Sequence, residues 1–125
     1  MIKTIIFDLC DTIVETAGVP GLLSLHGRLH GQDIKNWFVH NETFHAYEKG
    51  RADTDAFIDA FCRDLEIRVD KSEFLRVYEA LVIREIEGMP ALIRQIAHRY
   101  PLYALSNNNP LLWRATERIC SVLDT

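Results

Sequence analysis

The residues with the clearest chemical potential lie near the N-terminus, where Asp8, Cys10, Asp11 and Thr12 follow an apolar run rich in isoleucine. A short apolar run of this kind predicts a buried β-strand, and the run stops at Asp8. In open α/β sheets, ligands bind at the carboxyl ends of the parallel strands. A carboxylate placed there can act as a nucleophile or as a metal ligand. Taken alone, Asp8 could equally well cap the turn after the strand.

A second group of polar residues begins at Ser106 and Asn107, which follow an apolar stretch that starts at Pro101. This stretch predicts a second buried strand. A short hydroxyl group followed by a backbone N–H can hold an oxyanion without adding charge. The simpler interpretation is a strand-to-helix turn, in which Ser106 or an asparagine caps the next helix. Only the combination with Asp8 favours phosphate binding.

The segment around Asp8 resembles motif I of the haloacid dehalogenase-like (HAD) hydrolases, which is an apolar strand followed by Asp-x-Asp-x-Thr/Val. Asp8 and Thr12 fit this pattern. The resemblance implies that Asp8 is the catalytic nucleophile and forms an aspartyl-phosphate. It also implies Mg²⁺ as the cofactor, bound by Asp8 and by the backbone carbonyl of Cys10. Cys10, Asp11 and Thr12 would support the turn of motif I.

The later parts of the chain extend this resemblance from Ile2 to about Trp113. Leu105-Ser106-Asn107 resembles motif II, whose serine or threonine binds a phosphoryl oxygen, so Ser106 and Asn107 are the implied phosphate-binding residues. The stretch from Phe44 to Gly50 looks like the cap helices of HAD phosphatases. The nearest likeness is the branch of sugar-1-phosphatases and of the N-terminal domain of soluble epoxide hydrolases. In that branch the cap shapes the substrate pocket.

Three departures from the family pattern bear on activity. Cys10 stands where the family has a second aspartate that protonates the leaving group, and general acid–base help is typically worth ~10²–10⁴-fold. Asp11 stands where glycine is common, and we expect its side chain to point away from the site. Nothing after Ser106 supplies the motif III lysine or the motif IV acidic pair. We therefore expect weak activity or none from these residues by themselves.

Three functions remain open at this stage. The first is a HAD-type phosphatase, in truncated form, that acts on a small phosphorylated metabolite. The alternative is a non-catalytic or self-associating degenerate HAD chain, favoured by Cys10 and by the absent later motifs. The third is a C–halogen hydrolase, which ranks last because no arginine near motif I could receive a halide.

The expected fold class is α/β, a partial HAD-like Rossmannoid core of parallel strands with an α-helical cap inserted after the first strand. We place the core at residues 1–14 and 89–125 and the cap at residues 15–88. Apolar spacing predicts a short frayed helix around Leu22–Leu29 and helices within Asp33–Glu48, from Asp53 to Leu65, from Lys71 to Glu85, after Pro90 and after Pro110. A parallel pair of apolar strands needs cover on both faces of the sheet. We therefore expect the front half of a larger domain, or a homo-oligomer that closes unpaired sheet edges.

Composition narrows the range of partners. The net charge of −4 and the scattered basic residues argue against nucleic acid and against a membrane surface as partners. The three cysteines, Cys10, Cys62 and Cys120, lie far apart and form no zinc-type spacing, which is typical of reduced thiols in the cytoplasm. No apolar stretch approaches the twenty or so residues of a membrane span. We expect a cytoplasmic protein whose partner is a small phosphorylated substrate.

Overall fold

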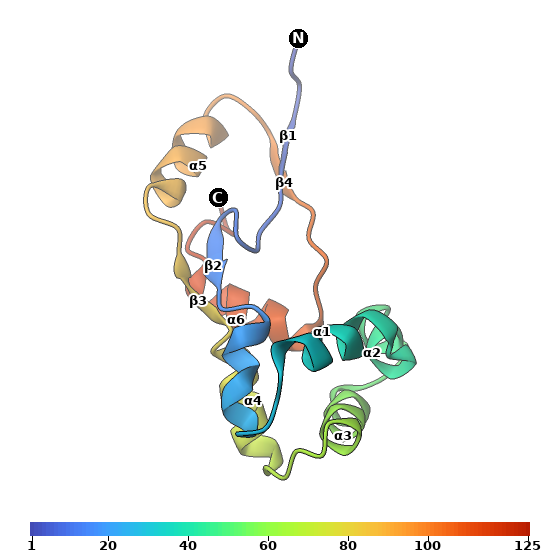
Figure 1. The fold of residues 1–125 in the computed structure, drawn as a ribbon. Coiled ribbons are helices and arrows are strands. Elements are labelled where there is room, and N and C mark those ends of the chain that lie inside the picture. The colour runs from blue at the N-terminus through green and yellow to red at the C-terminus, as the bar shows by residue number, and fades with distance from the viewer.

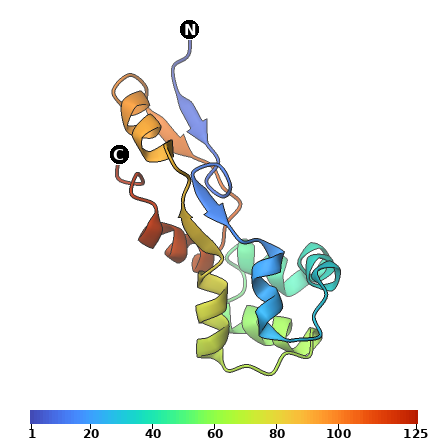
Figure 2. The ribbon, with the colours of Figure 1, turned by 60° about the vertical axis from the view of Figure 1, so that its left-hand side comes forward.

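The computed structural model describes residues 1–125 and combines strands and helices in two regions (Figures 1 and 2). One region, here called the helical region, gathers the helices between Val19 and Glu79 at one end of the molecule. The other holds the strands and the last two helices. The elements in chain order are β1 (Ile5–Phe7), β2 (Val14–Thr16), the 3₁₀ helix η1 (Val19–Leu25), α1 (Gly31–His40), α2 (Glu42–Glu48), α3 (Thr54–Asp64), α4 (Lys71–Glu79), β3 (Val82–Glu85), α5 (Met89–Ala97), β4 (Leu102–Ala104) and α6 (Pro110–Ile119). The predicted α/β class is confirmed.

The strands form two separate pairs. β1 runs parallel to β4, with Phe7 opposite Ala104, as the sequence predicts. β2 runs antiparallel to β3 and was not expected. The predicted helix from Lys71 to Glu85 is wrong in its second half, because α4 ends at Glu79 and β3 follows. The apolar residues after α4 fit a helical period as well as a strand, and pairing with β2 decides between the two.

The prediction that both strands of the parallel pair are buried is wrong for one face. Ile6 and Tyr103, which are opposite each other, are both 62% exposed, and Leu105 is 74% exposed. Side chains alternate between the two faces of a strand. Phe7 and Leu102 point to the other face, where they pack against the cluster that contains Ile93 of α5. In Figure 1, α5 lies to one side of the pair, and the exposure of Ile6, Tyr103 and Leu105 leaves the outer face of the pair without cover.

The helical region has its own core, which is rich in aromatic rings. Phe57, Phe61 and Phe74 are fully buried, and Tyr47 and Tyr78 are almost so. Their rings stack or meet edge to face, arrangements that add to the free energy gained from burial alone. A second, smaller cluster of buried residues lies between the strands and the helices α5 and α6.

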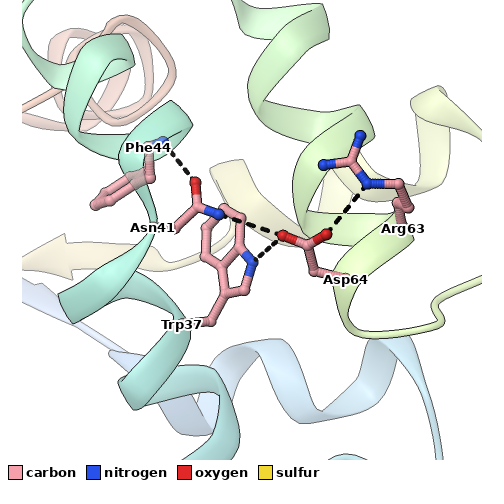
Figure 3. Close-up of polar contacts among 5 residues, drawn as sticks. All are labelled: Trp37, Asn41, Phe44, Arg63 and Asp64. Carbon is pink, nitrogen blue, oxygen red and sulfur yellow. Dashed lines mark hydrogen bonds and ion pairs between the residues drawn. The ribbon is translucent and has the colours of Figure 1, made fainter.

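A network of polar contacts ties the end of α3 to the junction of α1 and α2 (Figure 3). The indole N–H of Trp37 donates to Asp64 Oδ2 at 2.9 Å, and the Asn41 side chain donates to the same oxygen at 3.2 Å. Asn41 also caps α2, because its Oδ1 accepts from the backbone N–H of Phe44 at 2.8 Å. The network therefore links three helices through side chains from α1, α3 and the residue between α1 and α2.

Most other predicted helices are present with small changes. Asp53 caps α3 as expected, since its side chain accepts from the backbone N–H of Ala56 at 2.8 Å. The short frayed helix predicted around Leu22–Leu29 is the 3₁₀ helix η1 (Val19–Leu25). The helices expected within Asp33–Glu48 are α1 and α2. None of the helices combines the length and the apolar character needed to cross a membrane.

Candidate functional site

The parallel pairing of β1 and β4 brings the two predicted motifs side by side. Phe7 is opposite Ala104, and the backbone N–H of Leu105 donates to the carbonyl of Phe7 at 2.8 Å. Asp8 follows Phe7 at the carboxyl end of β1, and Ser106 follows Leu105 at the carboxyl end of β4. This edge of a parallel pair is where α/β proteins bind ligands.

Asp8 is exposed at this edge and has an oxygen available for chemistry. Its Oδ1 accepts from the backbone N–H of Leu9 at 2.8 Å, which fixes the direction of the carboxylate. No lysine or arginine forms an ion pair with it, because the salt bridges of the chain involve other carboxylates. Asp8 is therefore exposed at a strand end and has no positively charged partner among these residues.

The Cys10 thiol lies between the two motifs. Burial raises its pKa, the negative charges of Asp11 and Asp8 raise it further, and a hydrogen bond with the Ser106 side chain acts in the opposite direction. The net result is a pKa above the ordinary value, so the thiol stays protonated at neutral pH. A neutral thiol of this kind is a poor substitute for a carboxylic acid.

The turn after Asp8 is held by Asp11. Its backbone is left-handed, with φ of 59°, a conformation that aspartate tolerates better than most residues. The carboxylate accepts from the backbone N–H of Thr16 at 2.9 Å and from the Thr16 hydroxyl at 3.0 and 3.1 Å. Thr12 contributes a backbone hydrogen bond to the carbonyl of Leu9 at 3.3 Å. The Asp11 carboxylate thus holds the turn through Thr16, a partner that the sequence analysis did not name.

The residues proposed to bind Mg²⁺ supply one side of such a site. No backbone N–H donates to the carbonyl of Cys10, and Asp8 Oδ2 has no hydrogen-bond partner, so both oxygens are free to coordinate. Carbonyl and carboxylate oxygens are the ligands that Mg²⁺ prefers. No group of three or more His, Cys, Asp or Glu residues lies close enough to form a complete metal cluster. These two oxygens are of the kind that would hold the ion.

The loop after Ser106 contains three asparagines with different environments. Asn107 is exposed at the edge of the site. Asn108 Oδ1 accepts from the backbone N–H of Asn109 at 2.9 Å, while its Nδ2 is buried without a hydrogen-bond partner. Asn109 is only 5% exposed and caps α6, because its Oδ1 accepts from the backbone N–H of Leu112 at 3.1 Å. An asparagine cap was one of the two interpretations of this turn.

Two open hollows in the surface are lined by residues other than Asp8 and Ser106. One of about 1100 Å³ is in the helical region, between the loop at Leu25–Leu29 and the loop after α3. Another of about 640 Å³ is next to the motif I turn and is lined mostly by carboxylates, including those of Asp11 and Glu15. Neither is lined by Asp8 or Ser106, so the two strand ends form an exposed edge rather than the wall of either hollow.

Comparison with solved structures gives a consistent family of folds. The HAD family enzyme BT-2542 from Bacteroides thetaiotaomicron, solved in complex with magnesium and inorganic phosphate, matches with a TM-score of 0.74 and 18% identity over 93% of this chain and 58% of that chain. A predicted HAD-like family hydrolase from Porphyromonas gingivalis matches with a TM-score of 0.68 and 19% identity over 90% of this chain and 54% of that one. L-2-haloacid dehalogenase from Xanthobacter autotrophicus, with chloropropionic acid covalently bound, matches with a TM-score of 0.58 and 20% identity over 99% of this chain and 54% of that one.

These likenesses establish the fold, and no family model matches the sequence. At 18–20% identity the resemblance lies in the arrangement of the elements. The chain spans 54–58% of the length of the three solved structures.

Proposed function

Because the chain has the α/β fold of HAD hydrolases over a part of their length, we propose that it is the nucleophile-bearing portion of a phosphatase that acts on a small phosphorylated metabolite. The observation that carries the proposal is the placement of Asp8 and Ser106 at adjacent strand ends. Each of them directly follows a residue of the hydrogen bond between Leu105 and Phe7. The Asp8 carboxylate as nucleophile, beside the Ser106 hydroxyl and the backbone N–H of Asn107, fits a phosphoryl group. Inorganic phosphate bound to the neighbour BT-2542 supports this choice of ligand.

In the proposed reaction, an oxygen of Asp8 attacks phosphorus while the bond from phosphorus to the ester oxygen breaks. The leaving alkoxide takes its proton from water, because the Cys10 thiol is held neutral and is a weak acid. Water then attacks the phosphorus of the aspartyl-phosphate, the bond to Asp8 breaks, and inorganic phosphate leaves. The Ser106 hydroxyl and the Asn107 backbone N–H donate to the phosphoryl oxygens in both steps.

Mg²⁺ is the cofactor that we propose for this site, and when bound it would offset the repulsion between Asp8 and the phosphoryl oxygens. Asp8 and the Cys10 carbonyl would hold it, as their free oxygens allow. Magnesium in the structure of the neighbour BT-2542 supports the same choice.

We also propose that residues 15–88 act as a cap that shapes the substrate pocket, with residues 1–14 and 89–125 as the catalytic core. The aromatic core of the helical region supports this division, since all of its rings lie within residues 15–88. A cytoplasmic location is proposed from the three free cysteines, which are spread over both regions.

The test is covalent phosphorylation of the chain, which reports a single event and does not require turnover. The chain is incubated with Mg²⁺ and a small aryl phosphate, and the phospho-adduct is located by mass spectrometry. We expect the adduct on Asp8 and none in Asp8→Asn. Cys10→Asp, which restores a carboxylic acid, should raise phosphate release by up to ~10²–10⁴-fold, with Cys10→Ser as the matched control. An adduct that persists in Asp8→Asn would overturn the assignment.

A C–halogen hydrolase uses the same Asp8 in a different bond exchange, with carbon in place of phosphorus. The covalently bound chloropropionic acid in the dehalogenase neighbour is the observation that keeps this reaction in view. Chloride release from 2-chloropropionate, lost in Asp8→Asn, would support it over the phosphatase. No release of chloride under conditions that phosphorylate Asp8 would exclude it.

The second candidate function is non-catalytic self-association, in which two copies pair through the β1–β4 sheet. The exposed outer face of Ile6, Tyr103 and Leu105 favours it, because apolar strand faces with unpaired edges tend to find a partner. A second copy offers the same face and the same free edges, so the contact would be self-complementary. A dimer that forms with no phosphorylation of Asp8 would support this candidate over the phosphatase.

A further inference from the structure

A buried hydrogen bond connects the candidate phosphate loop to the helical region. Asn109, at the end of the loop that carries Ser106 and Asn107, uses both ends of its amide. Its Oδ1 caps α6 through the backbone N–H of Leu112, and its Nδ2 donates to the hydroxyl of Tyr78 at 3.2 Å. Asn109 is 5% exposed and Tyr78 is 2% exposed, so water does not compete for this bond.

The partner of Asn109 is held rigidly in α4. The ring of Tyr78 stacks on Phe74 with centroids 5.6 Å apart and meets the edge of Phe57 at 5.4 Å. Burial raises the pKa of the Tyr78 hydroxyl well above its ordinary value, so it remains a neutral hydrogen-bonding group at any physiological pH. Its position is therefore set by the aromatic core.

The loop has few other attachments. At its start, the backbone N–H of Leu105 donates to the carbonyl of Phe7 at 2.8 Å. Asn108 bonds only to the next residue, and its Nδ2 has no partner. At the far end, Asn109 bonds to Tyr78, and Leu111 is buried within the same cluster as Tyr78. The loop is thus fixed to β1 at one end and to α4 at the other.

We propose that Asn109 is a positioning residue that, through Tyr78, sets where Ser106 and Asn107 lie relative to Asp8. The helical region would then have a second role besides shaping a pocket, since α4 anchors the loop that receives the phosphoryl group. The description of this loop as a phosphate-binding loop rests on the proposed function. The hydrogen bond between Tyr78 and Asn109 does not.

The experiment compares two tyrosine-to-phenylalanine variants that each remove one hydroxyl from the same aromatic core. Tyr78→Phe removes the partner of Asn109. Tyr47→Phe is the matched control, because the Tyr47 hydroxyl is also buried and pairs with Thr54 instead of Asn109. Asn109→Ser tests the link from the other side, since serine keeps an oxygen to cap α6 but is too short to reach Tyr78.

The readouts are the amide chemical shifts of Ser106 and Asn107 by NMR and their response to added inorganic phosphate. We expect Tyr78→Phe and Asn109→Ser to shift both amides and to weaken phosphate binding about tenfold, as loss of one buried hydrogen bond allows. Tyr47→Phe should lower thermal stability to a similar extent and leave both amides in place. If Tyr78→Phe behaves like Tyr47→Phe in every readout, Asn109 has only a structural role and the proposal is wrong.

The two proposals fail in different ways. If the unmodified chain does not respond to phosphate, the proposed function loses its support, while the amide shifts in the variants still decide whether Tyr78 positions the loop. If phosphate binds to all variants with equal affinity and with unchanged amide shifts, the positioning role is excluded and the proposed function stands.

Discussion

The helical region and the β1–β4 sheet differ in how completely each buries its own apolar surface. The helical region packs its aromatic rings against one another, and Phe57, Phe61 and Phe74 have no exposed surface. The sheet covers one face with α5, α6 and the segment after α6, and leaves Ile6, Tyr103 and Leu105 open on the other. The helical region therefore buries its apolar surface mainly among its own rings, whereas the sheet leaves one apolar face without cover.

The strongest test of this difference between the two regions is to remove the central ring of the helical region. Phe57→Ala should lower the free energy of unfolding by about 3–5 kcal/mol, because it leaves a cavity among the rings that surround it. These are Trp37, Phe38, Phe44, Tyr47, Phe61, Phe74 and Tyr78, whose centroids lie 5.0–6.5 Å from that of Phe57. Urea denaturation followed by circular dichroism measures the change. An effect no larger than that of Ile6→Ala would contradict the comparison.

A smaller effect is expected at the start of α3. Asp53→Ala removes the side chain that accepts from the backbone N–H of Ala56 and should cost about 1 kcal/mol. Asp53→Asn is the matched control, since asparagine caps helices nearly as well. The same denaturation experiment measures both. Equal losses in the two variants would show that charge, and not the cap, stabilises α3.

A still smaller effect should appear as a pH dependence at the network of Figure 3. The hydrogen bond from Trp37 holds the pKa of Asp64 below its ordinary value, with a further contribution from Arg63. A depressed pKa stabilises the fold at pH values above the ordinary one, and this stability is lost as the pH falls through the folded-state value. Thermal melts between neutral pH and pH 3 should therefore show a smaller decline in Asp64→Asn than in the unmodified chain. Parallel declines would show that Asp64 does not contribute to acid lability.

The smallest effect on folding should come from the outer face of the sheet. Ile6→Lys changes a side chain that is 62% exposed, and such substitutions usually alter stability by within about 0.5 kcal/mol. Association should respond instead, because a charge on the outer face opposes pairing of two copies. Light scattering after gel filtration measures the mass. A dimer that persists in Ile6→Lys and Tyr103→Lys would place the contact elsewhere.

The positions of Asp8 and Ser106 could be predicted from the sequence because each depends on a local pattern. An apolar run that ends at a polar residue marks a strand end, and parallel pairing then brings two strand ends together. The cap of α3 at Asp53 was predictable for the same reason, since a cap is defined within one turn of the helix.

The features that were missed depend on contacts between distant segments. The segment of β3 was assigned to a helix because Val82 fits the spacing of a helix as well as that of a strand. Pairing with β2, which is far away in the sequence, makes this segment a strand. The Asn109–Tyr78 bond joins residues 31 positions apart, and no pattern at either position indicates the other. The exposure of Ile6 was missed because an apolar strand indicates that a face is meant to be covered, without indicating what covers it.

The pairing of β2 with β3 has a consequence for the modularity of the chain. The helical region leaves the sheet at Ala17 and returns at Leu81, and the backbone N–H of Ala17 donates to the carbonyl of Leu81 at 2.8 Å. The entry and exit of the insert are therefore held together by the strands that flank it. Halving or doubling such an insert changes the entropy of loop closure by only about 0.6 kcal/mol. Helical inserts of quite different size could be exchanged at this junction while β2 and β3 keep their pairing.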